Sequence, residues 1–318
     1  MIRIAHFTDL HVTEEPSRIP WRMLLSKRFL GWVNLSIFGR YRLFAESVRI
    51  GRALVRDLEA VRPDFIVSTG DLTGISLPSE FASAREVLSP ILEDPRVTGI
   101  PGNHDVYVRS AQREQLYEKS FGAWTRTDLS VDEIPTGFRD IHPYPLLRLL
   151  GDEVALFSLR DVRPTRYHDS SGRVGARQIA ALDSLFRHPR ATGRTKILAL
   201  HYGLCRADRS PDRRRHGLRD ATDLIEVIRR HSVSLVLHGH LHGRFVLEPT
   251  ALWPFAIANP GSVSSLQPHH SRAYHVLGVD RGHINLEVRR YDRTSECFQP
   301  WPEAPGAGRI SGNLRRGN

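Results

Sequence analysis

The sequence is poor in cysteine, in lysine and in long apolar runs, and each scarcity excludes a class of protein. Cys205 and Cys297 are the only cysteines among 318 residues. Two thiols are too few for a disulfide framework or a thiolate zinc site, and they fit a reducing compartment. No apolar run approaches the roughly 20 residues needed to span a bilayer. The chain enters its first apolar run at residues 2–7 without a charged leader, so we expect a cytoplasmic protein.

Positive charge is abundant, but almost all of it comes from arginine. Lysine and arginine together number 45 against 35 acidic residues, which gives a formal net charge of +10, and only three of the 45 are lysine. Because such a skew also follows from genome base composition, it is weak evidence for nucleic-acid binding. A positive balance still favours anionic partners such as phosphates, nucleotides and acidic lipid surfaces.

Short runs rich in β-branched residues alternate with helical patterns, which indicates an α/β architecture with a mixed sheet or a pair of sheets. The Pro- and Gly-rich residues 299–318 are expected to form a disordered tail after a single domain at 1–298. Strands are expected at 2–7, 65–69, 97–100, 154–159, 196–200, 233–237, 255–258, 274–279 and 284–288, and helices at 43–61, 79–93, 110–120, 176–187 and 221–231.

Polar side chains with metal-binding groups follow five of the expected strands. In α/β sheets, ligands bind beyond the carboxyl ends of strands, so these residues are expected to meet at one edge. Glycines at 70, 102 and 239 would let the backbone turn sharply there or approach an ion. The candidate donors are Asp9 and His11 after 2–7, Asp71 after 65–69, Asn103 after 97–100, His201 after 196–200, and His240 and His242 after 233–237.

The types and number of these donors indicate the kind of metal site. Carboxylate, amide and imidazole ligands together suit divalent Mn, Fe, Zn or Co better than calcium or a thiolate-bound metal. Seven donors exceed what one ion with open positions for water and substrate can use. Two ions about 3.5–4 Å apart, bridged by a carboxylate, would use all seven.

The blocks D-x-H, G-D, G-N-H-D, H and G-H-x-H, in this order between residues 9 and 242, resemble those of the calcineurin-like metallophosphoesterase superfamily. The resemblance implies a two-sheet β-sandwich flanked by helices, an α/β/β/α fold. It also implies two divalent metal ions and a catalytic histidine. By this resemblance Asp9, His11 and His242 hold the first metal, Asn103, His201 and His240 hold the second, Asp71 bridges them, and His104 is catalytic.

The implied activity is hydrolysis of a phosphodiester, phosphomonoester or pyrophosphate by a hydroxide that two metals activate, with His104 assisting the leaving group. The residues after Asp71, "LTGIS", lack the tyrosine of purple acid phosphatases and the V-D-R-G continuation of Ser/Thr protein phosphatases. A phosphoprotein substrate is therefore disfavoured. The segment "HYGLCR" at 201–206 lacks the second histidine and prolines that cyclic-nucleotide phosphodiesterases of the superfamily often carry, which weakens that assignment without removing it.

Within the superfamily that the chain resembles, the candidate substrates are a cyclic nucleotide or a nucleotide-linked lipid pyrophosphate, the latter favoured by the basic and aromatic residues 17–45 beside the first donor pair. Two alternatives stay open: a non-catalytic binding protein on this fold, and a DNA nuclease of the same superfamily. The intact set of seven donors and His104 argues against the first. A nucleic-acid partner is disfavoured because no obvious DNA-gripping addition accompanies the blocks.

Residues 17–45 contain six basic side chains, no acidic one, and several aromatics. Such a composition fits an element that lies on an anionic membrane, which would make the protein peripheral on the inner face of the membrane. The alternative is a lid packed on the domain with buried aromatics and exposed arginines. The Arg-rich loop 205–220 has a similar ambiguity between phosphate capture, by His216 or a neighbouring arginine, and a solvated surface. His238 lies outside the G-H-x-H block and is expected beside the site rather than among its ligands, as a neighbour of the ligands or part of the strand end.

Overall fold

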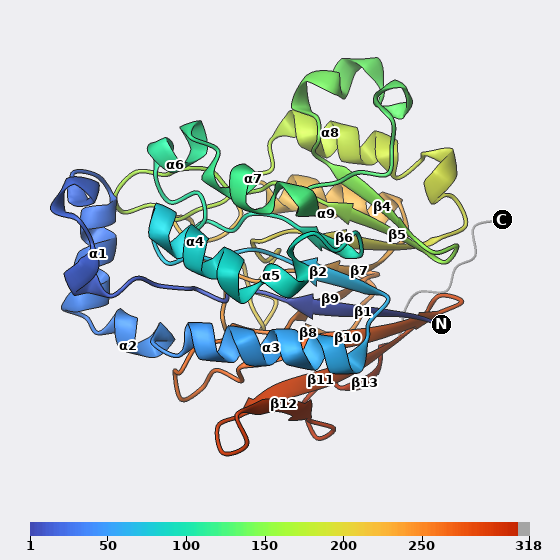
Figure 1. The fold of residues 1–318 in the computed structure, drawn as a ribbon. Coiled ribbons are helices and arrows are strands. Elements are labelled where there is room, and N and C mark those ends of the chain that lie inside the picture. The colour runs from blue at the N-terminus through green and yellow to red at the C-terminus, as the bar shows by residue number, and fades with distance from the viewer. Residues whose placement is uncertain (311–318) are drawn as a thin grey trace.

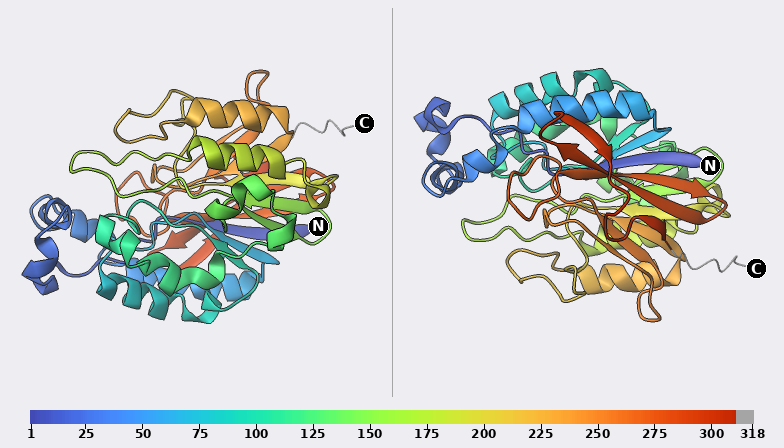
Figure 2. Two further views of the ribbon diagram at one scale, coloured as in Figure 1. Left: turned by 90° about the horizontal axis from the view of Figure 1, so that it is seen from above. Right: turned by 90° about the horizontal axis from the view of Figure 1, so that it is seen from below.

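In the computed structural model, which describes residues 1–310, two β-sheets lie face to face with helices on both outer sides (Figures 1 and 2). This confirms the α/β two-sheet sandwich. The first sheet has the order β12(Cys297–Pro300)-β11(His283–Asp292)-β10(Ala273–Asp280)-β1(Ile2–Phe7)-β2(Phe65–Ser68)-β3(Val97–Gly99), with β13(Gly308–Ile310) paired to β11. The second has the order β4(Leu146–Leu150)-β5(Val154–Ser158)-β6(Thr195–Ala199)-β7(Val233–Leu237)-β9(Ala256–Asn259)-β8(Phe245–Leu247).

Alternation of side chains along the strands builds three apolar layers. In β1, Ala5 and Phe7 face the helices, while Ile4 faces the second sheet, as the two-residue period of a strand requires. Leu156 and Leu235 of the second sheet meet Ile4 in the middle layer. Both faces of the central strands are therefore buried, which explains why their sequences read as continuous apolar runs.

The helices cover the outer faces of the two sheets, and particular residues determine where they end. Helix α3 buries Ile50, Leu54 and Leu58 against the first sheet and ends at Arg62, whose φ is +50°. The expected helix at 79–93 is two helices because Pro90 has no N–H to continue the ladder. The helices are α1 (Arg28–Ser36), α2 (Arg40–Phe44), α3 (Ser47–Val61), α4 (Pro78–Val87), α5 (Ser89–Leu92), α6 (Arg109–Arg113), α7 (Leu116–Phe121), α8 (Ala176–Leu185) and α9 (Ala221–Arg230).

Short 3₁₀ turns link these elements at Pro16–Arg18, Trp21–Leu24, Gly122–Trp124, Val131–Glu133, Thr136–Ile141 and Pro189–Ala191. In the described residues, no helix combines the length and the apolar character that a membrane crossing requires. Strands β1, β2 and β3 run parallel, as do β5, β6, β7 and β9. The loops that follow β1, β2, β3, β6 and β7 carry the candidate donors and converge at one end of the sandwich (Figure 1).

The expected disorder of residues 299–318 is wrong for residues 299–310, while 311–318 lie outside the described part of the chain. Strands β12 and β13 both pair with β11, and Ala304 and Ile310 are buried. These strands, like β4 and β8, escaped sequence reasoning. A Pro- and Gly-rich composition reports weak local propensity, whereas the strands form by pairing with a distant partner.

Ile310 offers a test of this C-terminal packing. It is 1% exposed, pairs with Ile284 of β11 within the first sheet, and places its side chain in the apolar layer between the two sheets. We expect Ile310→Ala to lower the free energy of unfolding by about 2–5 kcal/mol, because it leaves a cavity in the middle layer. The neighbouring exposed Arg309→Ala should change it by only about 0.5 kcal/mol. Urea unfolding followed by circular dichroism measures both, and equal stabilities for the two variants would contradict this packing.

Candidate metal centre

Five of the seven candidate donors adopt a left-handed backbone, which is uncommon for residues other than glycine. Asp9, His11, Asp71, His240 and His242 have φ values between +47° and +66°. Such conformations persist where the surrounding structure holds them, and they gather at functional sites. Here the amide of Asp9 donates to the carbonyl of Gly70, and the amide of His11 donates to the carbonyl of Asp71, at 2.9 Å each. The loops after β1 and β2 therefore brace each other.

The three glycines of the site permit contacts that any side chain would block. A Cβ on Gly70 would lie 2.2 Å from the amide nitrogen of Gly102, and one on Gly102 would lie 2.1 Å from Oδ1 of Asp71. A Cβ on Gly239 would lie 2.6 Å from Oδ2 of Asp9. Close approach of strand ends, as much as turning, is what requires glycine at these positions.

The first group of donors consists of Asp9, His11, Asp71 and His242, whose ligand atoms all lie within 4.8 Å of one another. Nε2 of His11 is 3.0 Å from Nε2 of His242, which is in turn 3.2 Å from Oδ1 of Asp9. Nδ1 of His11 lies 3.2 Å from the carbonyl oxygen of Thr73. A carbonyl only accepts, so Nδ1 carries the proton and Nε2 turns its lone pair toward the group.

The second group joins Asp71 to His201 and His240 within the same limit. Oδ1 of Asn103 lies 3.0 Å from Nε2 of His201 and 2.9 Å from Nδ1 of His240. The other ring nitrogens of these histidines face carbonyl oxygens, those of Thr69 and His216. The structure thus brings all seven predicted donors together, with Asp71 common to both groups.

These contacts fit a pair of cations. The unprotonated Nε2 of His11 faces Nε2 of His242 and has carboxylate oxygens of Asp9 and Asp71 at 3.6 and 3.7 Å, and the buried Oδ1 of Asp9 has no hydrogen-bond partner. Such a meeting of acceptors is repulsive unless positive charge lies among them. Ligand residues of the types present here commonly bind divalent transition metals, so the donor set and its geometry agree.

The electrostatics of the site point the same way. Burial opposes the charge of Asp71, yet the imidazoles of His201 and His104 keep its pKa below the usual range. Burial lowers the pKa of His11 and of His240, which favours the neutral rings that ligation needs. Burial also opposes a proton on His201, but the adjacent Asp71 raises its pKa to about 10. Positive charge is therefore favoured where the two groups meet.

His104 is held by its backbone and by both ring nitrogens. Its amide donates to Oδ1 of Asp71 at 2.7 Å, its Nδ1 donates to the carbonyl of Gly74, and its Nε2 accepts from Nη2 of Arg40 at 3.1 Å. The orienting group is thus a backbone carbonyl. Asp105 does not orient the ring; it accepts from the amides of three loop residues, Leu72, Thr73 and Gly102. Burial lowers the pKa of His104 well below its usual range.

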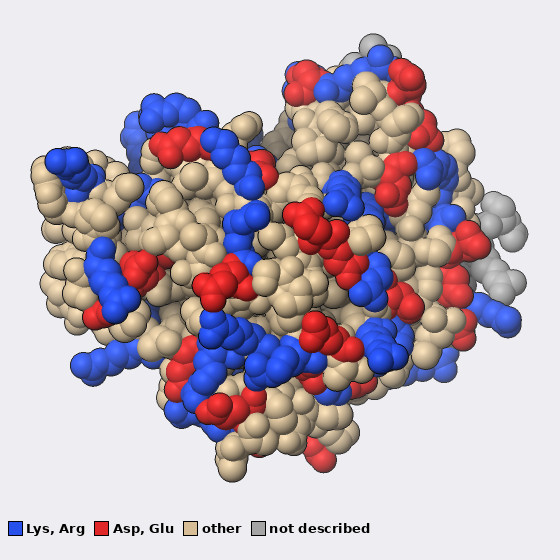
Figure 3. Space-filling model, viewed as in Figure 1, with Lys and Arg blue, Asp and Glu red and all other residues tan. Residues whose placement is uncertain are grey.

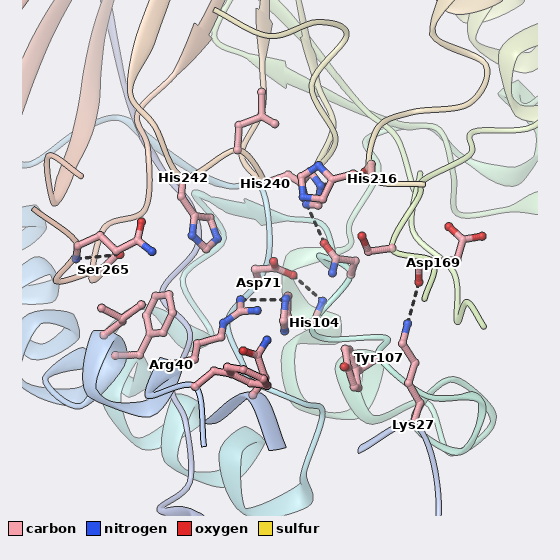
Figure 4. A pocket seen from close by; sticks show the side chains of 18 of the residues that line it. Lys27, Arg40, Asp71, His104, Tyr107, Asp169, His216, His240, His242 and Ser265 are labelled. Atoms are coloured by element: carbon pink, nitrogen blue, oxygen red, sulfur yellow. Dashed lines mark hydrogen bonds between the residues drawn. The ribbon is translucent and has the colours of Figure 1, made fainter. Parts of the chain in front are cut away.

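An open cavity of about 640 Å³ lies over both donor groups (Figure 4). Asp71, His240 and His242 line its floor beside His104, and Arg40 reaches it from α2. Sequence reasoning did not single out Arg40, whose only signal was the basic composition of residues 17–45. Lys27, Tyr107, Asp169, His216 and His270 also line the cavity.

His216 is the residue of the Arg-rich loop that reaches the site. Its Nδ1 lies 2.6 Å from Oδ2 of Asp212, and its ring centroid is 4.3 Å from that of His240. Asp212, His216 and His240 form a further cluster of metal-type side chains. His238, in contrast, belongs to none of these clusters; it is buried, with Nδ1 3.0 Å from the carbonyl oxygen of Gly239.

Comparison with known proteins gives one family and several relatives. The family model described as calcineurin-like phosphoesterase matches residues 2–244. A probable cyclic nucleotide phosphodiesterase from Rhodococcus erythropolis is 30% identical over 185 residues, which are 57% of this chain and 52% of that protein. The match thus spans about half of the relative's length.

Two solved structures share the fold at low sequence identity. A dimetal phosphatase from Danio rerio superposes with a TM-score of 0.62 and 14% identity, covering 91% of this chain and 96% of the other. PhoD superposes with a TM-score of 0.55 and 11% identity, covering 94% of this chain and 68% of the other.

Asp71→Asn tests whether this centre binds metal. The substitution keeps the size of the side chain but removes the charge shared by both donor groups. Losing a hydrogen-bond partner of a metal ligand lowers metal affinity by roughly 10–100-fold. Losing the ligand itself should lower it by at least as much. Competition with a chelator, read by elemental analysis, measures the change. Asp169→Asn, on the cavity wall outside the two donor groups, should bind as wild type; equal affinities for the two variants would refute the assignment.

Proposed function

The chain belongs to the calcineurin-like phosphoesterase family, and from this premise we propose that it hydrolyses a phosphodiester, phosphomonoester or pyrophosphate bond with two divalent metal ions. The observation that carries the proposal is the convergence of both donor groups on Asp71 beneath one open cavity. His104 shares that cavity, so donors and a candidate proton-transfer group face the same substrate.

The two ions, Mn, Fe, Zn or Co, would be held as the sequence predicts. Asp71 would bridge them, because its carboxylate belongs to both donor groups. When bound, such ions supply a nucleophile from water at neutral pH and neutralise charge on phosphoryl oxygens. The first ion would take Asp9, His11 and His242, and the second Asn103, His201 and His240.

His104 would act on the leaving group. Its Nδ1 is committed to the carbonyl of Gly74, so Nε2 is the atom that can exchange a proton with a ligand in the cavity. The hydrogen bond from its amide to Asp71 fixes the ring relative to the donor groups. Positioned acid–base groups of this kind contribute about 10²–10⁴-fold to rate.

Two substrate classes remain under this proposal. The name of the Rhodococcus erythropolis relative supports a cyclic nucleotide, although the match covers about half of that protein. A nucleotide-linked lipid pyrophosphate is supported by the surface of residues 17–45. The presence of all seven donors in contact disfavours a non-catalytic binding protein.

Residues 17–45 pack beside the cavity and combine features of both alternatives: Ile19, Leu35 and Phe44 are buried, as in a lid, whereas other apolar side chains are exposed. Lys27 and Arg28 turn inward: Nζ of Lys27 donates to Oγ1 of Thr165, and Arg28 donates to the carbonyls of Ile75 and Ser76. Five large apolar side chains of the segment face outward, and much of the surface over α1 in Figure 3 carries no charge. The outward-facing side chains, 49% to 76% exposed, are Trp21, Leu25, Phe29, Ile37 and Phe38.

We propose that this apolar face, defined as Trp21, Leu25, Phe29, Ile37 and Phe38, docks on an anionic bilayer. An exposed Arg18 and Arg22 lie beside it, and residues 17–45 contain no acidic side chain to oppose a negative surface. The segment forms one protruding end of the molecule in both views of Figure 2, clear of the sandwich. Large exposed apolar patches commonly mark interaction sites.

Activity is the first test. Purified protein supplied with manganese is expected to hydrolyse bis(p-nitrophenyl) phosphate, and a chelator should abolish turnover. His104→Ala should lower kcat by about 10²–10⁴-fold while elemental analysis finds the wild-type metal content. His269→Ala, an exposed histidine off the cavity, serves as the control. Turnover that survives chelation would show the two-metal proposal to be wrong.

Vesicle flotation tests the apolar face. The wild-type protein should float with vesicles of phosphatidylglycerol and phosphatidylcholine, and added salt should weaken the association. The triple variant Trp21→Ser, Ile37→Ser, Phe38→Ser should remain at the bottom of the gradient, because it removes most of the apolar area offered to the bilayer. Val131→Ser with Leu252→Ser removes exposed apolar side chains elsewhere and should float as wild type. Flotation of the triple variant would exclude this docking surface.

A further inference from the structure

Arg40 reaches the cavity from outside the five sequence blocks. It is the first residue of α2 and follows Gly39, whose φ is +70°. Figure 4 shows its guanidinium beside Asp71 and His104, within the cavity that covers both donor groups. Nη2 lies 3.1 Å from Nε2 of His104, the ring nitrogen that faces a substrate.

The charge of this guanidinium is not neutralised by an ion pair. Among residues 1–310, the Arg40 guanidinium forms no ion pair, although the charges of Asp71 and Asp9 lie near it, and its one side-chain hydrogen bond is the contact with His104. The ring of Phe44 lies 5.7 Å from Cζ and supplies an apolar wall. Guanidinium has five N–H donors and stays protonated in proteins, so several donors remain for a ligand.

Lys27, the other cation at the cavity, is committed elsewhere. Its Nζ donates to Oγ1 of Thr165 at 2.7 Å and to the carbonyl of Asp169 at 2.9 Å. Arg28 fixes the segment by donating to the carbonyls of Ile75 and Ser76, immediately after the Gly74 carbonyl that holds His104. Of the two cations among the described residues that line the cavity, Arg40 is therefore the one with N–H donors left for a ligand, and its segment is anchored to the same loop as His104.

We propose that Arg40 is a substrate-binding residue whose guanidinium takes non-bridging oxygens of the substrate's phosphoryl group. The planar fork of arginine matches two oxygens of a phosphate, which a lysine cannot do. On substrate entry, the N–H groups turn from His104 to the phosphoryl oxygens, which frees Nε2 of His104 for the leaving group. This inference rests on the proposed function, and it makes residues 17–45 part of the active site.

Binding of inorganic phosphate tests the proposal without turnover. Calorimetric titration into the manganese-loaded protein should give an affinity that falls about tenfold to a hundredfold in Arg40→Gln, as expected for losing charge-assisted hydrogen bonds. Arg40→Lys keeps the charge without the fork and should lie between the two. Arg42→Gln, two residues along the same helix and exposed, is the matched control and should bind as wild type.

The same titrations separate binding from positioning. If Arg40 served only to position His104, Arg40→Gln would lower kcat on bis(p-nitrophenyl) phosphate and leave phosphate affinity unchanged, which would overturn the proposal. His104→Ala should retain phosphate affinity that depends on Arg40. Metal content and the thermal midpoint, measured for each variant, identify a variant that is merely unfolded. If Arg40→Gln does not fold, the phosphate affinity of Arg40→Lys tests the proposal instead.

The outcome is independent of whether the protein turns over a given ester. A wild-type protein that binds phosphate through Arg40 but hydrolyses no phosphoester would refute the proposed function and leave the binding role standing. If instead the wild-type protein hydrolyses bis(p-nitrophenyl) phosphate and Arg40→Gln binds phosphate with full affinity, the proposed function stands and the binding role of Arg40 is refuted.

Discussion

The carboxylate of Asp71 is the contact on which the rest of the site depends. It belongs to both donor groups, and its Oδ1 accepts the amide of His104. The backbone carbonyl of Asp71 accepts a hydrogen bond from the amide of His11, which ties the loop after β2 to the loop after β1. Gly102 must lack a side chain to let it in. One residue thus sets the position of donors from both sheets and of the candidate catalytic histidine.

Holding these acceptors together opposes folding, and the sandwich offsets that cost. Left-handed φ values at five donors, a buried carboxylate oxygen without a partner and facing lone pairs each raise the energy of the loops. The strands beneath are buried on both faces, so their ends cannot shift without disturbing three apolar layers. The same rigidity preorganises the donors for cations, which reduces the rearrangement needed on binding.

The segment at 17–45 relates the site to its surroundings. Its inward side contributes Lys27, Arg28 and Arg40, each bonded to the body of the protein or to His104. Its outward side exposes large apolar residues around Phe38, which itself lines the cavity. Cations that point toward the site and large apolar side chains exposed on the same segment would suit an amphiphilic phosphoester, since its phosphate and its apolar group need different surroundings.

Local patterns in the chain were enough to anticipate an α/β architecture and the seven donors that the structure brings together, while the two-sheet sandwich followed from the resemblance to calcineurin-like phosphoesterases. Short apolar runs predict buried strands, and ligand residues at the carboxyl ends of neighbouring parallel strands meet at one edge of the sheet. Strands β12 and β13 could not be anticipated, because their own residues have weak strand propensity and the strands form only by pairing with β11. The sequence also did not predict that the side chain of Arg40 points into the cavity or that the side chain of Phe38 is exposed to solvent. Composition reports which side chains a segment carries, but only packing against the domain decides which of them face the cavity and which face solvent.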